Sequence, residues 1–370
     1  MAIAIHPYTE DRIAAVKAFN RRLAEGGVGP EFHFPESNVP HWLPKLEGRR
    51  IYQEYYLALD GEFVRGAFIL KFQEFSLAGE IQPVIYYHLP VSEGIVNQAY
   101  ASVGVLMLRS AMKMQPRLFA LGMGGFDRPL PTMLKALGWN LSAVPFYFRV
   151  CHPAAFLRQI AVLRQSPGRR FLGNLAAATG AGYLAIKTLH WLRTQSSLSD
   201  LGTELVASFD SWADQVWHQS CRHYPLIADR SSATLNVLYG ARKSFIPVRV
   251  ARGPETLGWA VLLDTEMRDN RYFGNLRVGT IADCLASPAS APALVQAATR
   301  ALEDRGVDLI IGNHSHAAWG NAFRASGYLQ GPSNFIFAAS KPLGERLSPF
   351  EAKQHEVYLM RGDGDGPVNL

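Results

Sequence analysis

The sequence predicts an α/β (α+β) protein of two similar halves, each a mixed, mostly antiparallel twisted sheet flanked by helices. The first observation is that the element order βββαβαβ occurs twice, at a separation of roughly 190 residues. The second is a glycine pattern, because Gly122 and Gly138 are 16 residues apart and Gly312 and Gly327 are 15 apart, each pair enclosing a helix. The third is composition, since 48% hydrophobic and 18% charged residues are typical of a folded protein.

The first half contains the element order once. Residues 52–92 are rich in aromatic and β-branched residues and are interrupted by the turn sequences DGE and AGE, which predicts three antiparallel strands. Residues 98–115 have helical spacing, and 118–125 form a short apolar strand. A short helix that stops at a glycine then covers 129–139, and 144–150 form the closing strand.

The second half repeats this order. Its predicted elements are three strands, a helix, a strand, a helix and a closing strand, at residues 244–252, 256–267, 273–286, 290–306, 307–313, 318–328 and 334–340. An internal duplication is the simplest explanation of the repeat.

The predicted domains are 1–150, a helical linker at 151–200, and 201–370. The linker contains 22 residues, 171–192, that are almost free of charge and long enough to span a bilayer. Three interpretations stay open: a packed linker helix or hairpin, a peripheral membrane contact through 169–192 aided by Arg169 and Arg170, and a true span. The packed linker is favoured because glycines and polar residues interrupt the segment.

Charge and cysteine content limit the partners and the compartment. The net charge of +6 is spread along the chain, which permits an acidic partner such as a CoA phosphate or an anionic lipid but does not favour nucleic acid. Three widely spaced cysteines form neither a disulfide framework nor a zinc pattern, so we expect a reducing bacterial cytoplasm. The N-terminus has no basic region before its short apolar stretch, so it predicts a strand rather than a signal peptide.

The repeated element order resembles the GNAT acyltransferase superfamily, and its doubling resembles tandem members such as the FemAB-like aminoacyl transferases. The sharpest points of resemblance are QAYASVGVLML after IYYHLPVS, the pair LFALGMGG and LKALGW, and LIIGNHSHAAWGNAFRASGY. The resemblance covers residues 3–150 and 203–361 and implies two GNAT-like domains. It also implies an acyl-CoA donor, acetyl-CoA or longer, and no metal cofactor.

In that family a Q/R-x-x-G-x-G/A loop at a helix N-terminus holds the CoA pyrophosphate through backbone N–H groups, which the helix dipole assists. Gln98, Ala101 and Val103 occupy the three signature positions, and Val103 is expected to crowd the phosphate. The alternative is an ordinary amphipathic helix after a loop. The resemblance implies a donor-binding loop of Gln98, Ala99, Tyr100, Ala101, Ser102, Val103 and Gly104.

The corresponding loop of the second half departs further from the signature. Residues 282–294 contain no Gln or Arg at the signature position, and Pro288 and Pro292 remove two N–H donors. We therefore expect this loop to bind the acceptor substrate or to have a purely structural role.

The resemblance places the reaction where the fourth and fifth strands of a half separate. His316 is the first candidate for the proton acceptor and His314 the second, because both follow a strand end and imidazole titrates near neutrality. Asp283 lies on the neighbouring strand. Two alternatives stay open. The histidines after the strand could merely cap the next helix, and His88 is the parallel candidate for the proton acceptor in the first half. No third ligand accompanies the His-x-His pair, so no metal is expected.

The predicted binding residues for the acceptor substrate are polar or aromatic. They lie near the same strand ends, in the loop before the closing strand, on the helix before the second sheet and in the C-terminal tail. Turn chemistry alone also accounts for several of them. The candidates are Asn313, Trp319, Asn334, Tyr239, Asp363 and Asp365.

These expectations combine into an acyl-CoA or acyl-carrier dependent N- or O-acyltransferase that acts on a polar metabolite, such as an amino sugar or a glycan precursor. An acyl carrier protein is a further expected partner. Two alternatives stay open: a FemAB-like transfer from aminoacyl-tRNA, and a catalytically silent tandem protein that binds a ligand.

Overall fold

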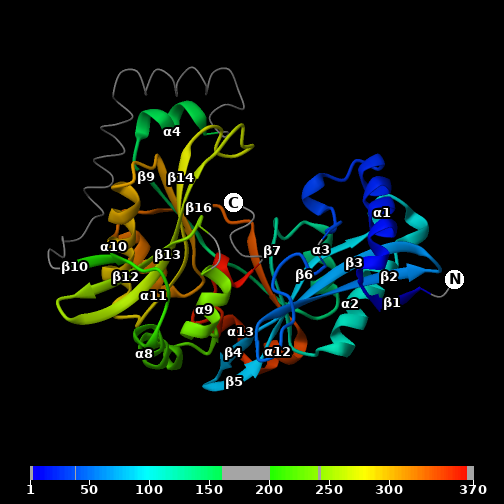
Figure 1. Cartoon of the computed structure of the whole chain (residues 1–370), viewed down its shortest axis with the longest axis horizontal. Helices are drawn as coiled ribbons and strands as arrows, with labels where there is room; N and C mark the ends of the chain where they lie inside the picture. The colour runs from blue at the N-terminus through cyan, green and yellow to red at the C-terminus, as the bar shows by residue number, and fades with distance from the viewer. Residues whose placement is uncertain (1–2, 38, 161–200, 241–242, 365–370) are drawn as a thin grey trace. The chain divides into compact units, whose positions relative to one another are not determined.

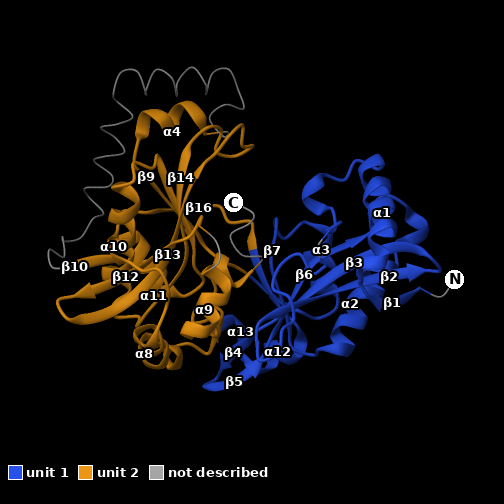
Figure 2. Cartoon of the chain, viewed as in Figure 1, with its two compact units in different colours: residues 1–142, 336–352 blue, residues 143–335, 353–370 orange. Residues whose placement is uncertain are grey.

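The computed structural model describes residues 3–37, 39–160, 201–240 and 243–364 (Figure 1). The chain forms two compact units, unit 1 from residues 1–142 and 336–352 and unit 2 from 143–335 and 353–370 (Figure 2). This division differs from the expected limits at 150 and 201 because each unit takes a segment from the other half of the sequence. Of the expected linker, the described part holds helix α4 (Pro153–Gln159), while residues 169–192 lie outside the described residues.

Unit 1 contains a seven-stranded mixed sheet in the order β1-β2-β3-β6-β7-β17-β8. Strands β1 to β6 of this series pair antiparallel, and β6 and β7 pair in parallel. The strands are β1 (Ala4–Pro7), β2 (Tyr52–Asp60), β3 (Phe63–Phe72), β6 (Ile85–Ser92), β7 (Leu118–Met123), β8 (Asn140–Ala143) and β17 (Phe335–Ala339). A separate hairpin joins β4 (Glu74–Leu77) and β5 (Glu80–Pro83).

Helices cover both faces of the unit 1 sheet, which agrees with the nearly continuous burial of β3. On one face, α1 (Ile13–Glu25) buries Val16, Phe19 and Leu23 against Leu57 and other residues of β2 and β3. On the other face, α2 (Val103–Met114) buries its apolar stripe against Phe68, Leu70 and Tyr87. The remaining helices of the unit are α3 (Pro129–Ala136), α12 (Lys341–Arg346) and the short α13 (Phe350–Lys353).

Unit 2 contains a second seven-stranded sheet in the order β10-β12-β13-β14-β15-β9-β16. Strands β14 and β15 pair in parallel, and the other neighbours pair antiparallel. The strands are β9 (Phe146–Val150), β10 (Leu201–Leu205), β12 (Ile246–Arg252), β13 (Glu255–Glu266), β14 (Arg277–Ala286), β15 (Leu309–Asn313) and β16 (Leu329–Gly331), with β11 (Leu226–Ala228) outside this sheet. Its helices are α8 (Ser211–Ser220), α9 (Ser232–Tyr239), α10 (Ala291–Glu303) and α11 (Ala317–Ala325).

The two closing strands are exchanged between the sheets. Sequence analysis expected 144–150 to complete the first sheet, but β9 pairs with β15 in the second, from Leu309–Val150 to Asn313–Phe146. Strand β17, expected in the second sheet, lies beside β7 in the first. The expectation was wrong because strand periodicity shows which residues face a core but not which edge the strand joins.

Each sheet opens between its one parallel pair of strands. β6 and β7 pair only at Ile85–Leu118 and Tyr86–Phe119, although both strands continue. β14 and β15 pair as far as Ile281–Gly312, and β14 continues to Ala286. A register irregularity lies on the neighbouring strand pair in both sheets, between Ala67 and Ile69 and between Val261 and Leu262. Such irregularities bend a strand, which accounts for the separation of the parallel pair.

Candidate functional site

The opening in unit 1 lies beside the N-terminus of α2. A single 3-10 turn (Gln98–Tyr100) precedes the helix, and Asn97 starts this turn by accepting the Ala99 N–H at 3.1 Å. The helical bonding begins with the Leu106 N–H to Ser102 carbonyl bond at 3.0 Å. The N–H groups of Val103, Gly104 and Val105 therefore belong to the first turn, whose donors have no acceptor within a helix. An anion at this end would accept these bonds and meet the positive end of the helix dipole.

The side chain of Val103 does not crowd this end of the helix, so that expectation was wrong. Val103 is fully buried in the core and packs over β3, where a Cβ on Gly66 would lie 2.9 Å from its Cγ1. Gly104 has space instead, since the nearest atom to a Cβ built there is Met133 Sδ at 3.9 Å. Residue 104, rather than the signature residue 103, is therefore the position that keeps this helix end open.

Two arginines anchor the loop that leads into α2. Glu93, which is 3% exposed, accepts from Arg22 at 3.0 Å and from Arg65 at 3.0 Å. The guanidinium of Arg65 also lies over the ring of Tyr100, 4.2 Å from its centroid. This network holds Tyr100 and the 3-10 turn in place next to the opening.

His88 lies on β6 inside the opening, with Tyr86 on the same sheet face. The Tyr86 hydroxyl donates to the Leu121 carbonyl at 3.0 Å, and His88 Nδ1 lies 3.2 Å from the same hydroxyl oxygen. Since a carbonyl can only accept, the hydroxyl proton points to Leu121 and the oxygen accepts from His88 Nδ1–H. The neutral ring of His88 therefore carries its lone pair on Nε2, which is the form that a proton acceptor requires.

The chain turns sharply where β7 ends. Gly122, Met123, Gly124 and Gly125 all have positive φ values, of 95°, 64°, 76° and 127°. Glycine adopts this region without strain, and three of the four positions hold it. Only Met123 therefore contributes a side chain to this edge of the opening.

In unit 2 the corresponding region, at the end of β15, is filled by side chains. His314 is fully buried, its ring is stacked on Trp319 with centroids 5.0 Å apart, and it meets the edge of Tyr358 at 4.4 Å. Its Nδ1 accepts the His316 N–H at 3.1 Å, so the proton of the neutral ring is on Nε2. Burial lowers the pKa of His314 well below its usual range. His314 therefore remains neutral inside the core, and Nε2 has no hydrogen-bond partner among the described residues.

His316 is the N-cap of α11. Its Nδ1 accepts the Ala318 N–H at 3.1 Å, which again puts the proton on Nε2. Burial lowers the pKa of His316 to about 4. To act as a base this ring would have to give up its bond to the helix, so the geometry favours the capping role that sequence analysis left open.

Asp283, the third predicted catalytic residue, is part of a buried ionic cluster. Arg230 Nε donates to Asp283 Oδ1 at 3.1 Å, and Arg230 Nη2 donates to Asp363 Oδ1 at 2.9 Å. The Tyr239 hydroxyl donates to the other oxygen of Asp283 at 2.8 Å. Burial raises the pKa of Asp283, and the charge of Arg230 opposes this rise. All four side chains are at most 2% exposed, so they have structural partners rather than access to a substrate.

The predicted acceptor residues lie mostly in the same core. Asn313 bonds to the Pro145 carbonyl and accepts from Arg361 Nε at 2.9 Å, and Trp319 Nε1 donates to the Tyr224 hydroxyl at 2.9 Å. Asn334 is exposed, away from these contacts. Asp365 lies outside the described residues. Unit 2 thus brings Asn313, Trp319, Tyr239 and Asp363 together, but as packed and bonded groups.

Sequence analysis missed the segment that joins these groups. Residues 357–363 contact His314, Ser315, Cys284 and Asp283, from the ends of both β14 and β15. The apolar run VYLM before RGD was a signal for a buried extended segment, but nothing in the sequence related it to these two strands.

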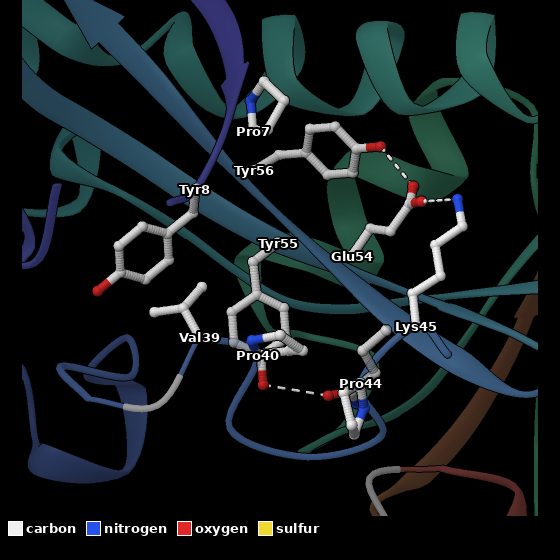
Figure 3. Close-up of a pocket in the computed structure, with 10 residues that line it drawn as sticks. Pro7, Tyr8, Val39, Pro40, Pro44, Lys45, Glu54, Tyr55 and Tyr56 are labelled. Atoms are coloured by element: carbon white, nitrogen blue, oxygen red, sulfur yellow. Dashed lines mark hydrogen bonds and ion pairs between the residues drawn. The ribbon is translucent and has the colours of Figure 1, made fainter. Parts of the chain in front are cut away.

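Unit 1 also contains a pocket of about 350 Å³ beside the first residues of β2, next to the end of β1 (Figure 3). Its polar side consists of Glu54, which accepts from Lys45 Nζ and from the Tyr56 hydroxyl, both at 2.7 Å (Figure 3). Tyr55, in the wall of the pocket, pairs across the strands with Ile69, and Ile69 pairs in turn with His88. Ile69 lies between the other two and is only 2% exposed. The pocket therefore does not continue along the sheet face to the opening.

Among residues 3–37, 39–160, 201–240 and 243–364, no three His, Cys, Asp or Glu side chains gather as a metal site would require. No helix within the described parts of the chain has the length and apolar character needed to cross a membrane.

Comparison with solved structures shows the fold. No family model and no curated protein sequence matches the chain. N-myristoyltransferase of Saccharomyces cerevisiae with bound myristoyl-CoA aligns with a TM-score of 0.52 and 8% identity, over 92% of this chain and 78% of that one. A probable N-acyltransferase from Enterococcus faecalis aligns with a TM-score of 0.50 and 10% identity, over 94% and 74%. The prediction of two mixed sheets, each flanked by helices, is thereby confirmed.

Replacing Arg230 by Ala should reduce the free energy of unfolding by about 3–5 kcal/mol, because two buried carboxylates lose their counter-ion. Urea denaturation followed by tryptophan fluorescence measures this. Arg277→Ala is the control, since Arg277 is 40% exposed and its partner Asp264 keeps Arg305; its loss of stability should be much smaller than that of Arg230→Ala. Equal losses in the two variants would contradict a structural role for the buried cluster.

Replacing His316 by Asn should weaken the dependence of stability on pH. The folded-state pKa of His316, about 4, lies below its ordinary value of 6.5, so the unfolded chain binds the proton more readily. The stability that neutral His316 contributes is complete above about pH 6.5 and is lost as pH falls toward 4. Asn keeps a cap oxygen without titrating. Unfolding at pH 7 and pH 5 should therefore differ less in His316→Asn than in the wild type, and an unchanged difference would refute this reading.

Proposed function

We propose that the protein is a GNAT-type acyltransferase that takes its acyl group from a CoA thioester at the opening of unit 1. The observation that carries the proposal is the separation of β6 and β7 beside the open N-terminus of α2. The separated strands expose backbone groups to the amides of a pantetheine arm. The first turn of α2 offers N–H groups to a pyrophosphate.

The donor assignment is supported by the packing of α2. Val103 is held in the core below Gly66, while Gly104 has no side chain, so phosphate oxygens can approach the helix end. The similar yeast N-myristoyltransferase was solved with myristoyl-CoA, which supports a CoA thioester as donor.

We assign the role of proton acceptor to His88. In the proposed reaction the acceptor nitrogen attacks the thioester carbonyl, its proton passes to His88 Nε2, and the C–S bond breaks to release CoA. Tyr86 positions the ring by accepting from Nδ1–H, and the same bond stabilises the imidazolium that forms. The histidines of unit 2 lack this arrangement because both have their lone pair in use at Nδ1.

For the acceptor we propose a polar amine, such as an amino sugar or a glycan precursor, with a hydroxyl as the O-acyl alternative. This acceptor class comes from the family resemblance, since the polar row Gln53, Lys71 and Tyr86 on the sheet face of His88 is at most 4% exposed. A cytoplasmic location, an acyl carrier partner and a peripheral membrane contact through 169–192 belong to the same proposal.

A catalytically silent ligand-binding protein is the second candidate, because Ala101 and Val103 replace small signature residues of the donor loop. An aminoacyl-tRNA transferase is less favoured, since the basic residues are spread along the chain. Binding of CoA without turnover of any amine would favour the silent protein.

Gly104→Glu should weaken CoA binding at least tenfold, because the carboxylate would occupy the anion position at the first turn of α2. The same carboxylate interacts favourably with the helix dipole, so thermal stability should be unchanged or higher. Isothermal titration with CoA and a thermal melt measure the two effects. Ser110→Glu, two turns along the helix, is the matched control and should bind CoA normally. Normal binding by Gly104→Glu would remove this helix end from the donor site.

His88→Gln should lower kcat about 10²–10⁴-fold and leave the Kd for CoA unchanged, since it removes general-base catalysis without touching the donor loop. Release of free CoA thiol during acyl transfer to an amine panel measures turnover. His316→Asn retains its helix cap and should keep near wild-type turnover. The opposite pattern, with His88→Gln active and His316→Asn inactive, would contradict the assignment of His88 and would indicate that the reaction takes place in unit 2.

A further inference from the structure

The opening of unit 2 contains a segment of the same chain. Tyr358 forms a parallel bridge with Ile227 of β11, and Met360 has an extended backbone. The Tyr358 N–H donates to the Leu226 carbonyl at 2.9 Å. On the other side, the Ser315 N–H donates to the Leu359 carbonyl at 3.1 Å, directly after β15. The segment is therefore bonded on both sides, as a strand within a sheet is.

Side-chain contacts tie the same segment to β14. The Tyr358 hydroxyl donates to the Cys284 carbonyl, and Met360 Sδ lies 3.5 Å from Cys284 Sγ. Gly362 packs so closely that a Cβ there would clash with the Tyr239 hydroxyl and lie 3.0 Å from Asp283 Oδ2. Residues 357–363 thus extend across the opening from the end of β15 to the end of β14.

Ser315 joins the segment to β15 through its side chain as well. Its Oγ accepts the Leu359 N–H at 2.8 Å and donates to the Val357 carbonyl. The backbone polar groups of the segment are thereby satisfied by protein, which a buried segment requires. The Tyr224 hydroxyl donates to the Ala286 carbonyl at 3.1 Å, so a second β14 carbonyl beyond the pairing is also occupied.

Charge and the preceding loop also disfavour a nucleotide donor here. The positive charge of Arg230 is paired with Asp283 and Asp363, so it is not available to bind a phosphate. Helix α10 has proline in its first turn, and the Ser287 hydroxyl is bonded to that of Ser290. The helix end therefore has fewer N–H donors than the first turn of α2.

From these contacts we infer that the opening of unit 2 is a peptide-binding groove whose permanent occupant is residues 357–363 of the same chain. The segment takes the place that a thioester arm would need, so the chain binds one donor molecule, not two. Ser315, in the loop after β15, and Arg230, which links Asp283 of β14 to Asp363, are the positioning residues that hold the occupant.

Hydrogen exchange followed by mass spectrometry on the full chain tests the inference. In the wild type, peptides that cover 357–361 should exchange at least a hundredfold more slowly than unstructured peptide. Ser315→Ala should accelerate their exchange about tenfold, as loss of two hydrogen bonds in a buried segment predicts. Unstructured-like exchange of 357–361 in the wild type would overturn the inference.

Ser340→Ala is the matched control. Ser340 is also fully buried, and its Oγ accepts the Leu118 N–H at 3.0 Å and donates to the Pro116 carbonyl at 2.8 Å. This variant loses the same pair of bonds in unit 1, so it should accelerate exchange near 116–118 and leave 357–361 unchanged. Acceleration of 357–361 in both variants would mean general destabilisation and would count against the inference.

A second arm adds saturating CoA to the wild type. The inference expects no change in exchange at 357–361 or at 284–290. Faster exchange at 357–361 together with new protection at 284–290 would show that the donor displaces the segment, and would refute the inference. Protection at 98–106 tests the proposed function separately, because its absence would count against the donor site in unit 1 while the result at 357–361 stands.

Discussion

Two parallel strands that separate leave backbone N–H and C=O groups without strand partners inside a protein. Such groups are costly to bury unless something bonds to them. In both sheets a register irregularity on the neighbouring strand accompanies the separation. The rest of each unit can be understood from how these groups and the adjacent helix end are satisfied.

The two units solve this problem in different ways. In unit 2 the hydroxyls of Tyr224 and Tyr358 take two β14 carbonyls, and Ser315 binds the inserted segment. Trp319 and His314 fill the remaining space with stacked rings. In unit 1 glycines replace bulky groups at the end of β7. A core thus forms in one opening, while the other has glycines at the end of β7 and a histidine whose lone pair is on Nε2.

The histidines show why residue type alone is a weak guide to chemistry. His88, His314 and His316 all follow or lie on strands at an opening, and sequence analysis preferred the last two. The hydrogen bond at Nδ1 distinguishes them, because it fixes which nitrogen holds the lone pair. The partner is two residues away in each case, a tyrosine hydroxyl for His88 and a backbone N–H for His314 and His316, so the sequence contained the partners but did not show which of these bonds would form.

The sequence by itself determined the elements and their repetition, since periodicity and glycine stops are local properties of the chain. It identified most strands of the two sheets and the helix that starts near Val103, while the openings between a fourth and a fifth strand were implied by the family resemblance. Tertiary structure decided which sheet the closing strands joined, that Val103 faces the core, and that residues 357–363 fill the second opening. These outcomes depend on pairing and packing between residues far apart in the sequence, where the competing arrangements have the same local pattern.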